Sequence, residues 1–478
     1  MLFNTPTFLV FLAAVLVLYS GARSHAQRAA VLLVASFIFY ASWKPAYLLL
    51  LIGSLSINYW FYSALTRTRS TALVVSAVAL NLVVLAIAKY IVFLTDNFIF
   101  VWTAATGESI NVPDWMHWAL PLGISFYTFH MLSVMIDVYR GQWTDRISFR
   151  TWTLYVTFFP HMVAGPILRA SELVEQLERL APLRLDDLKL GALLFLGGLM
   201  KKLLLADHLA GIANEVYAAP DLVSTAQAWY GTLAFSLQIY FDFSGYSEMA
   251  IGLARMFGVT LPRNFLYPYI SRNPRDFWQR WHITLSRWLR DYLYVSLGGS
   301  RVSFARNQVN LLTTMLLGGL WHGASWTFVV WGAIHGLWLV AHRFLLVFFE
   351  RLGLNSRPRL AGALSLAGWP VTFLIVTFTW VFFRATGFHA ASQMCVAMLG
   401  GGTDGGALEI RTFEKGIVWM AGAVALLEPR FVAWCVRIDL PGRWWQVSPL
   451  LRGTAYAGLT LMLVIFGGPV QKFIYFDF

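Results

Sequence analysis

Two stretches of the sequence combine residues that could carry out chemistry. Residues 275–301, RDFWQRWHITLSRWLRDYLYVSLGGSR, hold five arginines, two aspartates and one histidine among tryptophans and tyrosines. Residues 318–336, GGLWHGASWTFVVWGAIHG, hold two histidines in apolar surroundings. Guanidinium groups bind phosphates through paired planar donors, and histidine suits general acid–base work near neutral pH. The two stretches together indicate an anion-binding segment that belongs with a proton-transferring side chain.

The histidines of the second stretch, His322 and His335, are thirteen residues apart. On one continuous helix they would point to roughly opposite faces, about 20 Å apart along the axis, so they could not both act on one bond. A helix break at Gly323 would remove this limit. Ionisable groups inside a membrane are costly to bury and are therefore candidates for function. From spacing alone, a hydrogen-bonded core histidine and a catalytic base are equally good interpretations of each residue.

The arginines of the first stretch also have two interpretations. If residues 275–292 form a helix with about 100° per residue, four arginines fall within roughly 140° of arc, opposite most of the aromatic side chains, and His282 lies at the border. The four arginines are Arg275, Arg280, Arg287 and Arg290. Such an amphipathic helix, or two short ones, would lie along the membrane surface and hold lipid phosphates. Alternatively, some of the arginines contact an anionic cosubstrate.

A further polar group is Asp242, which lies in the apolar run YFDFSGYSEMAIG. It could line a cavity or form a structural ion pair, and the sequence favours neither. In FFPHMVAGPILR, residues 158–169, prolines and a glycine predict a broken helix, which is tolerated at membrane depth only where it is buried or lines a cavity. The sequence contains no HExxH, GxSxG, Walker A or CxxC motif that would point to another chemistry.

The elements that position these groups are predicted to be membrane helices. The chain is 58% hydrophobic and only 13% charged, whereas a soluble domain has about 25% charged residues. The mean hydropathy of +0.61 and the long apolar runs predict an all-α polytopic membrane protein. The net charge of +12 is explained by basic cytoplasmic loops facing anionic lipid, so no nucleic-acid partner is expected.

Thirteen apolar runs predict the helices, and some are short enough to be re-entrant. The runs cover residues 5–20, 29–42, 45–62, 71–94, 118–138, 150–165, 189–205, 224–254, 308–321, 325–349, 362–383, 414–436 and 448–468. Basic early loops and an acidic loop at 95–116 place the N-terminus outside. The loop at 262–307 holds eight arginines. Each would cost roughly 2.5–3.5 kcal/mol at the bilayer centre, so we expect this loop at the cytoplasmic face or inside the protein.

Seven ordered stretches make the chain resemble the membrane-bound O-acyltransferase family, in its bacterial branch of alginate O-acetylases and their relatives. The stretches are MLFNTPTFLVFL, LPLGISFYTFHMLSVMIDVYRG, FFPHMVAGPILR, YFDFSGYSEMAIGLARMFG, RNFLYPYISRNPRDFWQRWHITLSRWLRDYLYVSLGGSR, GGLWHGASWTFVVWGAIHG and FIYFDF. The resemblance implies a ring of about 11–13 tilted transmembrane and re-entrant helices around a central tunnel. It implies one membrane-embedded domain over residues 1–478, with N-terminal helices at about 1–138, a catalytic core at about 150–349 and C-terminal helices at about 362–478.

The resemblance also assigns site residues. His322, in the WHG motif, is similar to the family's catalytic histidine, and His282, in QRWHITLS, is similar to its second histidine. His322 would then be the general base, while His282 would orient or polarise a substrate group. The other expected substrate-binding residues are Arg275, Arg280, Arg287, Arg290, Asp242 and Trp321. His130 and Asp477 stand where a glutamine is expected, which leaves the acceptor open.

The expected donor substrate is acetyl-CoA, with no metal and no other cofactor. The expected product is an O-acetylated exopolysaccharide such as alginate, made at a bacterial inner membrane with a periplasmic polysaccharide acetyltransferase as partner and membrane lipids around the helices. Two alternatives remain open. One is a related acyltransferase with a carrier-protein donor, as in D-alanyl transfer. The other is a polysaccharide exporter without acyl chemistry, for which an inverted repeat would be expected and is not seen in the sequence.

Overall fold

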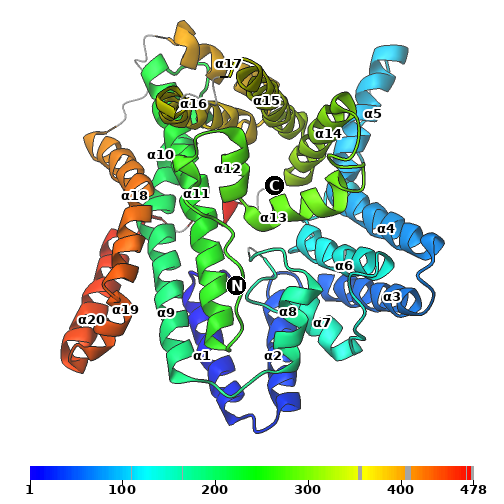
Figure 1. Cartoon of the computed structure of the whole chain (residues 1–478), viewed down its shortest axis with the longest axis vertical. Helices are drawn as coiled ribbons and strands as arrows, with labels where there is room; N and C mark the ends of the chain where they lie inside the picture. The colour runs from blue at the N-terminus through cyan, green and yellow to red at the C-terminus, as the bar shows by residue number, and fades with distance from the viewer. Residues whose placement is uncertain (109, 164, 354–357, 404–410, 470, 475–478) are drawn as a thin grey trace. The chain divides into compact units, whose positions relative to one another are not determined.

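The computed structural model describes residues 1–478 except 109, 164, 354–357, 404–410, 470 and 475–478, so Asp477 lies outside the described residues. The described residues form α-helices with short 3₁₀ and π turns, and none of them belongs to a strand (Figure 1). Within the described part of the chain, six helical segments are long and apolar enough to cross a membrane: Tyr47–Thr68, Thr71–Thr106, Trp326–Arg351, Gly362–Arg384, Glu414–Arg437 and Pro449–Phe466. The prediction of an all-α, multi-pass membrane protein is confirmed.

The described chain divides into two compact units, each built from two separate stretches of sequence. The first unit contains Met1–Leu196 and Tyr246–Arg263, and the second contains Gly197–Gly245 and Asn264–Phe478. Two of the three boundaries fall inside helices, α9 (Leu185–Met200) and α11 (Thr225–Met256), and the third lies in the loop between Arg263 and Asn264. All the residues singled out above as site candidates belong to the second unit.

The first unit is organised around a short buried helix. Its helices are α1 (Pro6–Gly21), α2 (His25–Ala41), α3 (Tyr47–Thr68), α4 (Thr71–Leu85), α5 (Ile91–Thr106), α6 (Ile124–Tyr139), α7 (Phe149–Thr157) and α8 (Ala170–Glu178). Nearly every side chain of α6 is buried, and α3, α4 and α7 pack against it. With 16 residues, α6 is shorter than the roughly 20 residues that a membrane span needs. It is therefore a core helix of this unit.

The predicted break at residues 158–169 lies in this unit and is buried. The chain leaves the helix after Thr157, and its backbone is held by side chains of neighbouring elements. The N–H of Leu168 donates to Nε2 of His130 at 3.0 Å, and the hydroxyl of Tyr155 donates to the carbonyl of Leu168 at 2.8 Å. Such partners are what irregular backbone requires in an apolar interior.

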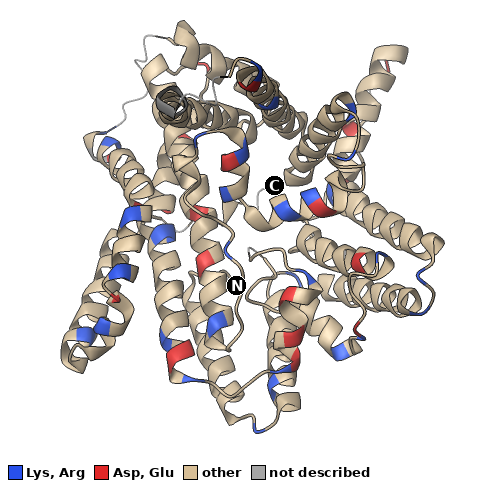
Figure 2. Cartoon of the chain, in the orientation of Figure 1, with Lys and Arg blue, Asp and Glu red and all other residues tan. Residues whose placement is uncertain are grey.

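The second unit carries the stretches with candidate chemistry. Its further helices are α10 (Asp207–Ala218), α12 (Pro274–Arg280), α13 (Ile283–Trp288), α14 (Phe304–His322), α15 (Trp326–Arg351), α16 (Pro358–Arg384), α17 (Phe388–Val396), α18 (Thr412–Arg437), α19 (Leu440–Gln446) and α20 (Pro449–Phe466). Figure 2 shows that charged residues are sparse along most of these helices and gather on α12 and α13.

Glycines bring α14 and α15 together as an antiparallel hairpin. A Cβ on Gly319 would lie 2.3 Å from the carbonyl oxygen of Phe328, and one on Gly332 would lie 2.3 Å from that of Met315. No other residue type allows two helix backbones to approach this closely, because any side chain would meet the opposite backbone. The hairpin is thus fixed by its small residues, and it carries His322 at the end of its first helix.

The arginine-rich stretch forms two short helices, α12 and α13, and not the single amphipathic helix that was the other prediction for it. Asn273 caps α12 by accepting a hydrogen bond from the N–H of Asp276 at 2.8 Å, and Pro274 occupies the first turn. The helix ends at Arg280, and His282 takes left-handed backbone angles, φ 42° and ψ 55°, before α13 begins. The break changes the direction in which the later side chains point.

Candidate active site

His322 lies at the end of α14 in an aromatic enclosure. Its side chain is 2% exposed. Its ring centroid lies 5.2 Å from that of Trp331, nearly perpendicular to it, and 5.3 Å from that of Phe383. The helix stops here because Gly323 takes an extended conformation in which a Cβ would lie 2.1 Å from the ring of Phe328. The stop leaves the imidazole at a helix end inside an apolar interior.

His282 is fully buried at the junction of α12 and α13. A left-handed conformation costs a non-glycine residue about 1–2 kcal/mol, so the surroundings must hold it in place. Asn264 does so, because its carbonyl accepts from the N–H of Ile283 at 2.9 Å and its Oδ1 accepts from the hydroxyl of Thr284 at 3.0 Å. Backbone outliers of this kind are concentrated at functional sites.

The two histidines meet although 40 residues separate them in the sequence. Their ring centroids are 6.3 Å apart and the ring planes are tilted by 49°. Trp321 contacts both, at 5.0 Å from His322 and 6.1 Å from His282. Burial lowers the pKa of His282 to about 3, so its ring is neutral at physiological pH. A neutral imidazole offers one N–H donor and one lone pair.

His335 is a hydrogen-bonded core residue. Its Nε2 lies 3.0 Å from the hydroxyl oxygen of Thr379, and that hydroxyl donates its own hydrogen to the carbonyl of Val376 at 2.7 Å. The Nε2 atom must therefore carry the hydrogen that Thr379 accepts. His335 contacts Trp331 at 4.8 Å, so it supports the enclosure of His322 from the far side of that ring.

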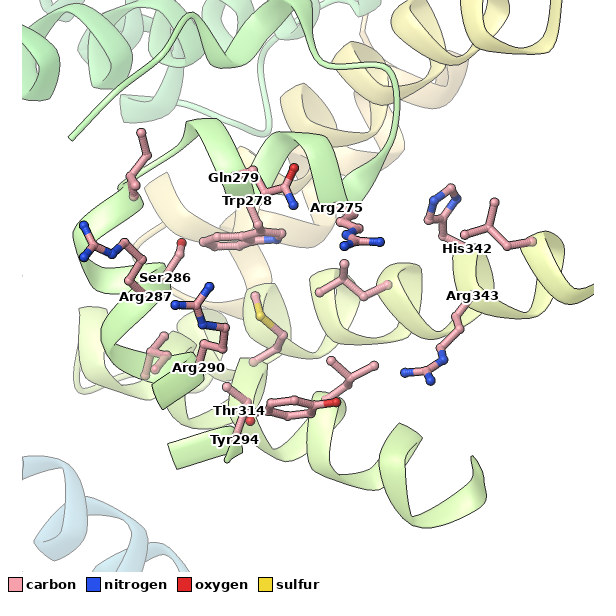
Figure 3. Close-up of a pocket in the computed structure, with 16 residues that line it drawn as sticks. Arg275, Trp278, Gln279, Ser286, Arg287, Arg290, Tyr294, Thr314, His342 and Arg343 are labelled. Atoms are coloured by element: carbon pink, nitrogen blue, oxygen red, sulfur yellow. The ribbon is translucent and has the colours of Figure 1, made fainter. Parts of the chain in front are cut away.

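A cavity of about 790 Å³ lies between α12, α13, α14 and α15, and we call it the arginine pocket. It is lined by Arg275, Trp278, Gln279, Ile283, Ser286, Arg287, Leu289, Arg290, Tyr294, Leu311, Thr314, Met315, Leu339, His342, Arg343 and Leu346. Figure 3 shows Arg287 and Arg290 at one end, Arg275 and Arg343 at the other, and Trp278 between them. Three of the four predicted arginines thus line one cavity.

The sequence reasoning missed two residues of this pocket, Arg343 and His342, which lie on α15. They interrupt the apolar run at 325–349, and ionisable groups within such a run are functional candidates. Arg343 donates to the side-chain oxygen of Asn307 on α14. Arg290 forms a double hydrogen bond with Asp291, at 2.7 and 3.1 Å. The pocket lining itself contains four arginines and no carboxylate, which favours an anionic ligand.

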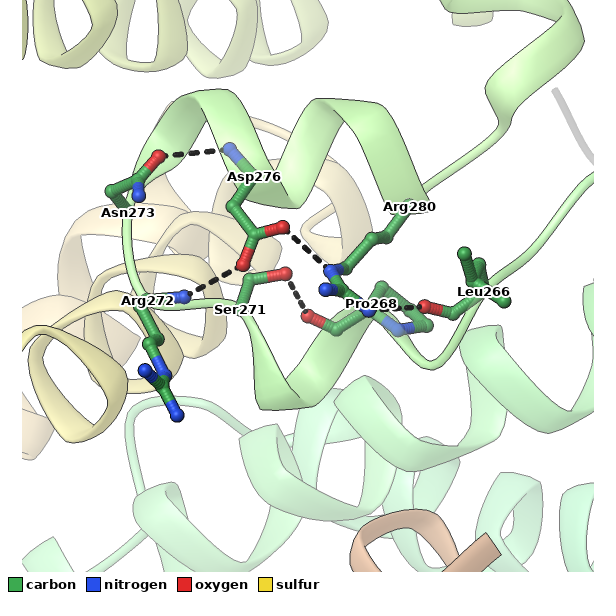
Figure 4. A network of polar contacts seen from close by, with 7 residues as sticks. All are labelled: Leu266, Pro268, Ser271, Arg272, Asn273, Asp276 and Arg280. Atoms are coloured by element: carbon green, nitrogen blue, oxygen red, sulfur yellow. Dashed lines mark hydrogen bonds and ion pairs between the residues drawn. The ribbon is translucent and has the colours of Figure 1, made fainter. Parts of the chain in front are cut away.

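Arg280, the fourth predicted arginine, lies in a separate polar network (Figure 4). Its Nε donates to Asp276 at 2.6 Å and its Nη1 donates to the carbonyl of Leu266 at 3.3 Å. Asp276 in turn accepts from the backbone N–H of Arg272 at 3.2 Å. These contacts join α12 to the preceding loop, and the structure does not place Arg280 in the arginine pocket.

Asp242, on α11, is buried and lies 2.8 Å from Nζ of Lys202. Its other carboxylate oxygen accepts from the backbone N–H of Ile474 at 2.8 Å. The sequence left open whether Asp242 lines a cavity or forms an ion pair, and the structure shows an ion pair with Lys202. The next residue, Phe243, contacts the ring of His282 at 4.7 Å. Asp242 therefore lies one residue away from the histidine site without being placed in it.

Comparisons with known proteins agree on one family. The model of the membrane-bound O-acyltransferase family matches residues 82–383, which include both histidines and the arginine pocket. The Pseudomonas aeruginosa protein named "Probable alginate O-acetylase AlgI" is 43% identical over 411 residues, covering 84% of this chain and 76% of that protein. The peptidoglycan O-acetyltransferase of Helicobacter pylori is 35% identical over 436 residues, covering 84% and 80%. The teichoic acid D-alanyltransferase of Bacillus subtilis is 26% identical over 283 residues, covering 56% and 69%.

Proposed function

The chain belongs to the membrane-bound O-acyltransferase family, and on this premise we propose that it moves acetyl groups from cytoplasmic acetyl-CoA across a bacterial inner membrane for the O-acetylation of an exopolysaccharide such as alginate. The observation that carries the proposal is the meeting of His282 and His322, at 6.3 Å, inside a buried aromatic enclosure. A periplasmic polysaccharide acetyltransferase would act as partner and complete the transfer to the polymer.

Acetyl is proposed as the transferred group because of the names and identities of the related proteins. The two named for O-acetylation are at least 35% identical to the chain over 84% of its length, whereas the D-alanyltransferase is 26% identical over 56%. Acyl transfer from a carrier protein is therefore the second candidate, favoured only by the more distant relatives.

In the proposed reaction His322 acts as the general base. Its imidazole takes the proton of an acceptor hydroxyl while that oxygen attacks the thioester carbonyl carbon. The C–S bond then breaks, and the thiolate of CoA receives the proton from His322, which restores the neutral base. His282 donates its N–H to the carbonyl oxygen or to the acceptor and so orients it. General base catalysis contributes typically about 10²–10⁴ in rate, and holding donor and acceptor together contributes the rest.

The arginine pocket is the proposed binding site for the phosphates of the donor. Its guanidinium groups come from α12, α13, the π turn Leu289–Tyr294 that follows α13, and α15, so they can surround an extended polyanion. Trp278 offers a flat face between them. The pocket and the histidine site share a structural element, because Ile283 lines the pocket and follows His282 directly. Trp278 also contacts Trp331 at 5.8 Å, and Trp331 contacts His322. These contacts support a donor whose phosphates and thioester occupy neighbouring sites.

The test is acetyl transfer from labelled acetyl-CoA into exopolysaccharide, in membranes that contain equal amounts of each variant. His322→Ala is expected to lose the label from the polymer while polymer export continues. His335→Gln is the matched control, because this histidine lies on the same hairpin and is bonded to Thr379. Normal acetylation in the His322 variant would contradict its assignment as base. Loss of export with an unchanged acetyl content would instead support an exporter.

A further inference from the structure

A buried ion cluster joins Lys202, on the π turn Lys201–Ala206 that follows α9, to Asp207 at the start of α10 and to Asp242 on α11. The Nζ atom of Lys202 is 2.7 Å from a carboxylate oxygen of Asp207 and 2.8 Å from one of Asp242, and all three side chains are at most 2% exposed. Nζ also donates to the carbonyl of Lys472 at 3.4 Å. An ammonium group has three donors, so these three acceptors match it. Burying such charges is costly, and the site proposed for acyl transfer makes no use of them.

The cluster holds the C-terminal tail, the described residues 467–469 and 471–474. The N–H of Ile474 donates to Asp242 at 2.8 Å. At the start of the tail, the N–H of Gly468 donates to the carbonyl of Leu203 at 2.9 Å. A Cβ on Gly468 would lie 2.9 Å from Cβ of Asp207. The tail is thus fastened at two points, to the π turn that carries Lys202 and to α11, which carries Asp242.

The held tail reaches the surroundings of the histidine site. Phe473 is fully buried, and its ring centroid lies 5.7 Å from that of Phe243. Phe243 contacts the ring of His282 at 4.7 Å, and it also contacts Phe265 at 4.9 Å. Phe265 in turn lies parallel to the ring of His282, with centroids 6.4 Å apart. Phe473 therefore packs directly against one of the rings that contact His282, and that ring in turn packs against Phe265.

We propose that Lys202, Asp207 and Asp242 form a clamp that holds the C-terminal tail as a wall behind His282, and that Asp242 is a positioning residue for acyl transfer. The inference rests on the proposed function and adds a role for a segment far from the histidines in sequence. When the clamp is opened, Phe473 leaves Phe243 and the packing of His282 loosens. The kcat then falls, while the KM for acetyl-CoA, which depends on the arginine pocket, stays unchanged.

The experiment compares Lys202→Met with Lys201→Met. Lys201 is the neighbouring residue and pairs with Glu428 at 2.5 Å, so it controls for the loss of a partly buried ion pair on the same π turn. Both variants are made in a background with Cys395→Ala, Cys435→Ala and a buried reporter, Ile474→Cys. In the Lys202 variant, maleimide labelling of the reporter is expected to rise by on the order of tenfold. The kcat is expected to fall by on the order of tenfold. The Lys201 variant is expected to change neither.

Two results would overturn the proposal. If the reporter stays protected in the Lys202 variant, the cluster does not hold the tail. If the reporter is labelled while kcat is unchanged, the tail is not a wall of the site. Should the Lys202 variant fail to fold, Phe473→Ala tests the same wall without touching the cluster, and an unchanged kcat there contradicts the proposal. Maleimide labelling of the reporter does not depend on enzymatic activity. If the reporter protein with an intact cluster shows no acetyl transfer, the proposed function is refuted, and labelling alone still tests whether the cluster holds the tail.

Discussion

The imidazole rings of His282 and His322 lie 6.3 Å apart, and each stands at an interruption of the helical chain. His322 is the last residue of α14, and His282 directly precedes α13. In a continuous helix a side chain is confined to a fixed position on the helix surface. Both histidines are released from this constraint, so the chain can bring two rings to one place from elements that run in different directions.

Replacing Arg275 by glutamine is expected to raise the KM for acetyl-CoA by on the order of tenfold, because a hydrogen bond to a charged group contributes about 1.5–3 kcal/mol. The value of kcat should stay close to that of the wild type, since the histidine site is untouched. Initial rates at varied acetyl-CoA and a fixed acceptor concentration measure both constants.

Arg280→Gln is the matched control for this prediction, because Arg280 lies on the same helix and bonds to Asp276 and Leu266 instead of lining the pocket. It should lower thermal stability and leave the KM for acetyl-CoA within about twofold. An equal rise of KM in both variants would contradict the assignment of Arg275 to donor binding and of Arg280 to a structural role.

The left-handed backbone of His282 predicts an unusual order of tolerance at this position. Asparagine adopts this conformation more readily than other non-glycine residues, whereas a β-branched residue is strongly disfavoured there. His282→Asn should therefore fold with nearly unchanged thermal stability and lose activity, while His282→Val should lose both. Melting temperatures of the purified proteins in detergent measure the difference, and equal stabilities of the two variants would contradict the backbone argument.

Burial of His282 predicts a loss of stability in acid. Its folded-state pKa of about 3 lies below the ordinary value of 6.5. Between these values the unfolded chain binds a proton that the folded chain does not, so stability falls as the pH falls below about 6.5. Burial also lowers the pKa of His161, to about 4, which adds a fall of the same sign. The drop in melting temperature from pH 7.5 to pH 5 should be smaller in His282→Asn than in the wild type.

The glycine contact of the α14–α15 hairpin predicts a large effect from one methyl group. Gly319→Ala would place a Cβ against the backbone of α15, and overpacking of this kind costs about 1–3 kcal/mol. Gly453→Ala, on α20, meets nothing within 4 Å and should be neutral or slightly stabilising because alanine favours helix. Fluorescence-detected size exclusion after heating compares the two. Equal midpoints would mean that the hairpin can separate to admit the methyl group.

Most of the long helices could be predicted from the sequence because they are marked by apolar runs. The short helices α10 (Asp207–Ala218) and α17 (Phe388–Val396) fall outside those runs, and α5 (Ile91–Thr106) extends into the stretch at 95–116 that was expected to be a loop. The run at 325–349 corresponds to α15 (Trp326–Arg351), and the run at 448–468 corresponds to α20 (Pro449–Phe466). The pairing of His282 with His322 was expected only from the resemblance to the family, because spacing alone left a core histidine and a catalytic base equally good. Local patterns of this kind predict the type and extent of a single helix, and they are sufficient for features that depend on one helix alone.

Features that depend on several elements escaped the sequence. A single helix over 275–292 would place most of the aromatic side chains opposite the arginines, whereas in the structure Trp278 lines the same pocket as Arg275, Arg287 and Arg290. Arg343 joins that pocket from α15, and Ile474 reaches Asp242 across 232 residues. Periodicity describes neighbours within an element and contains no information about which elements converge. The individual residues could therefore be identified in the sequence, but the residues that surround them in space could not.

The end of α14 at His322 also has an electrostatic consequence. The last carbonyl groups of a helix have no amide partners within it, and together they give that end a partial negative charge of about half an electron. His322 is the final residue of α14, so its ring lies within reach of this field. When the imidazole accepts a proton, the field favours the resulting cation without requiring a carboxylate. In the proposed reaction, the peptide backbone would thereby take the part that the aspartate plays in a serine–histidine–aspartate triad.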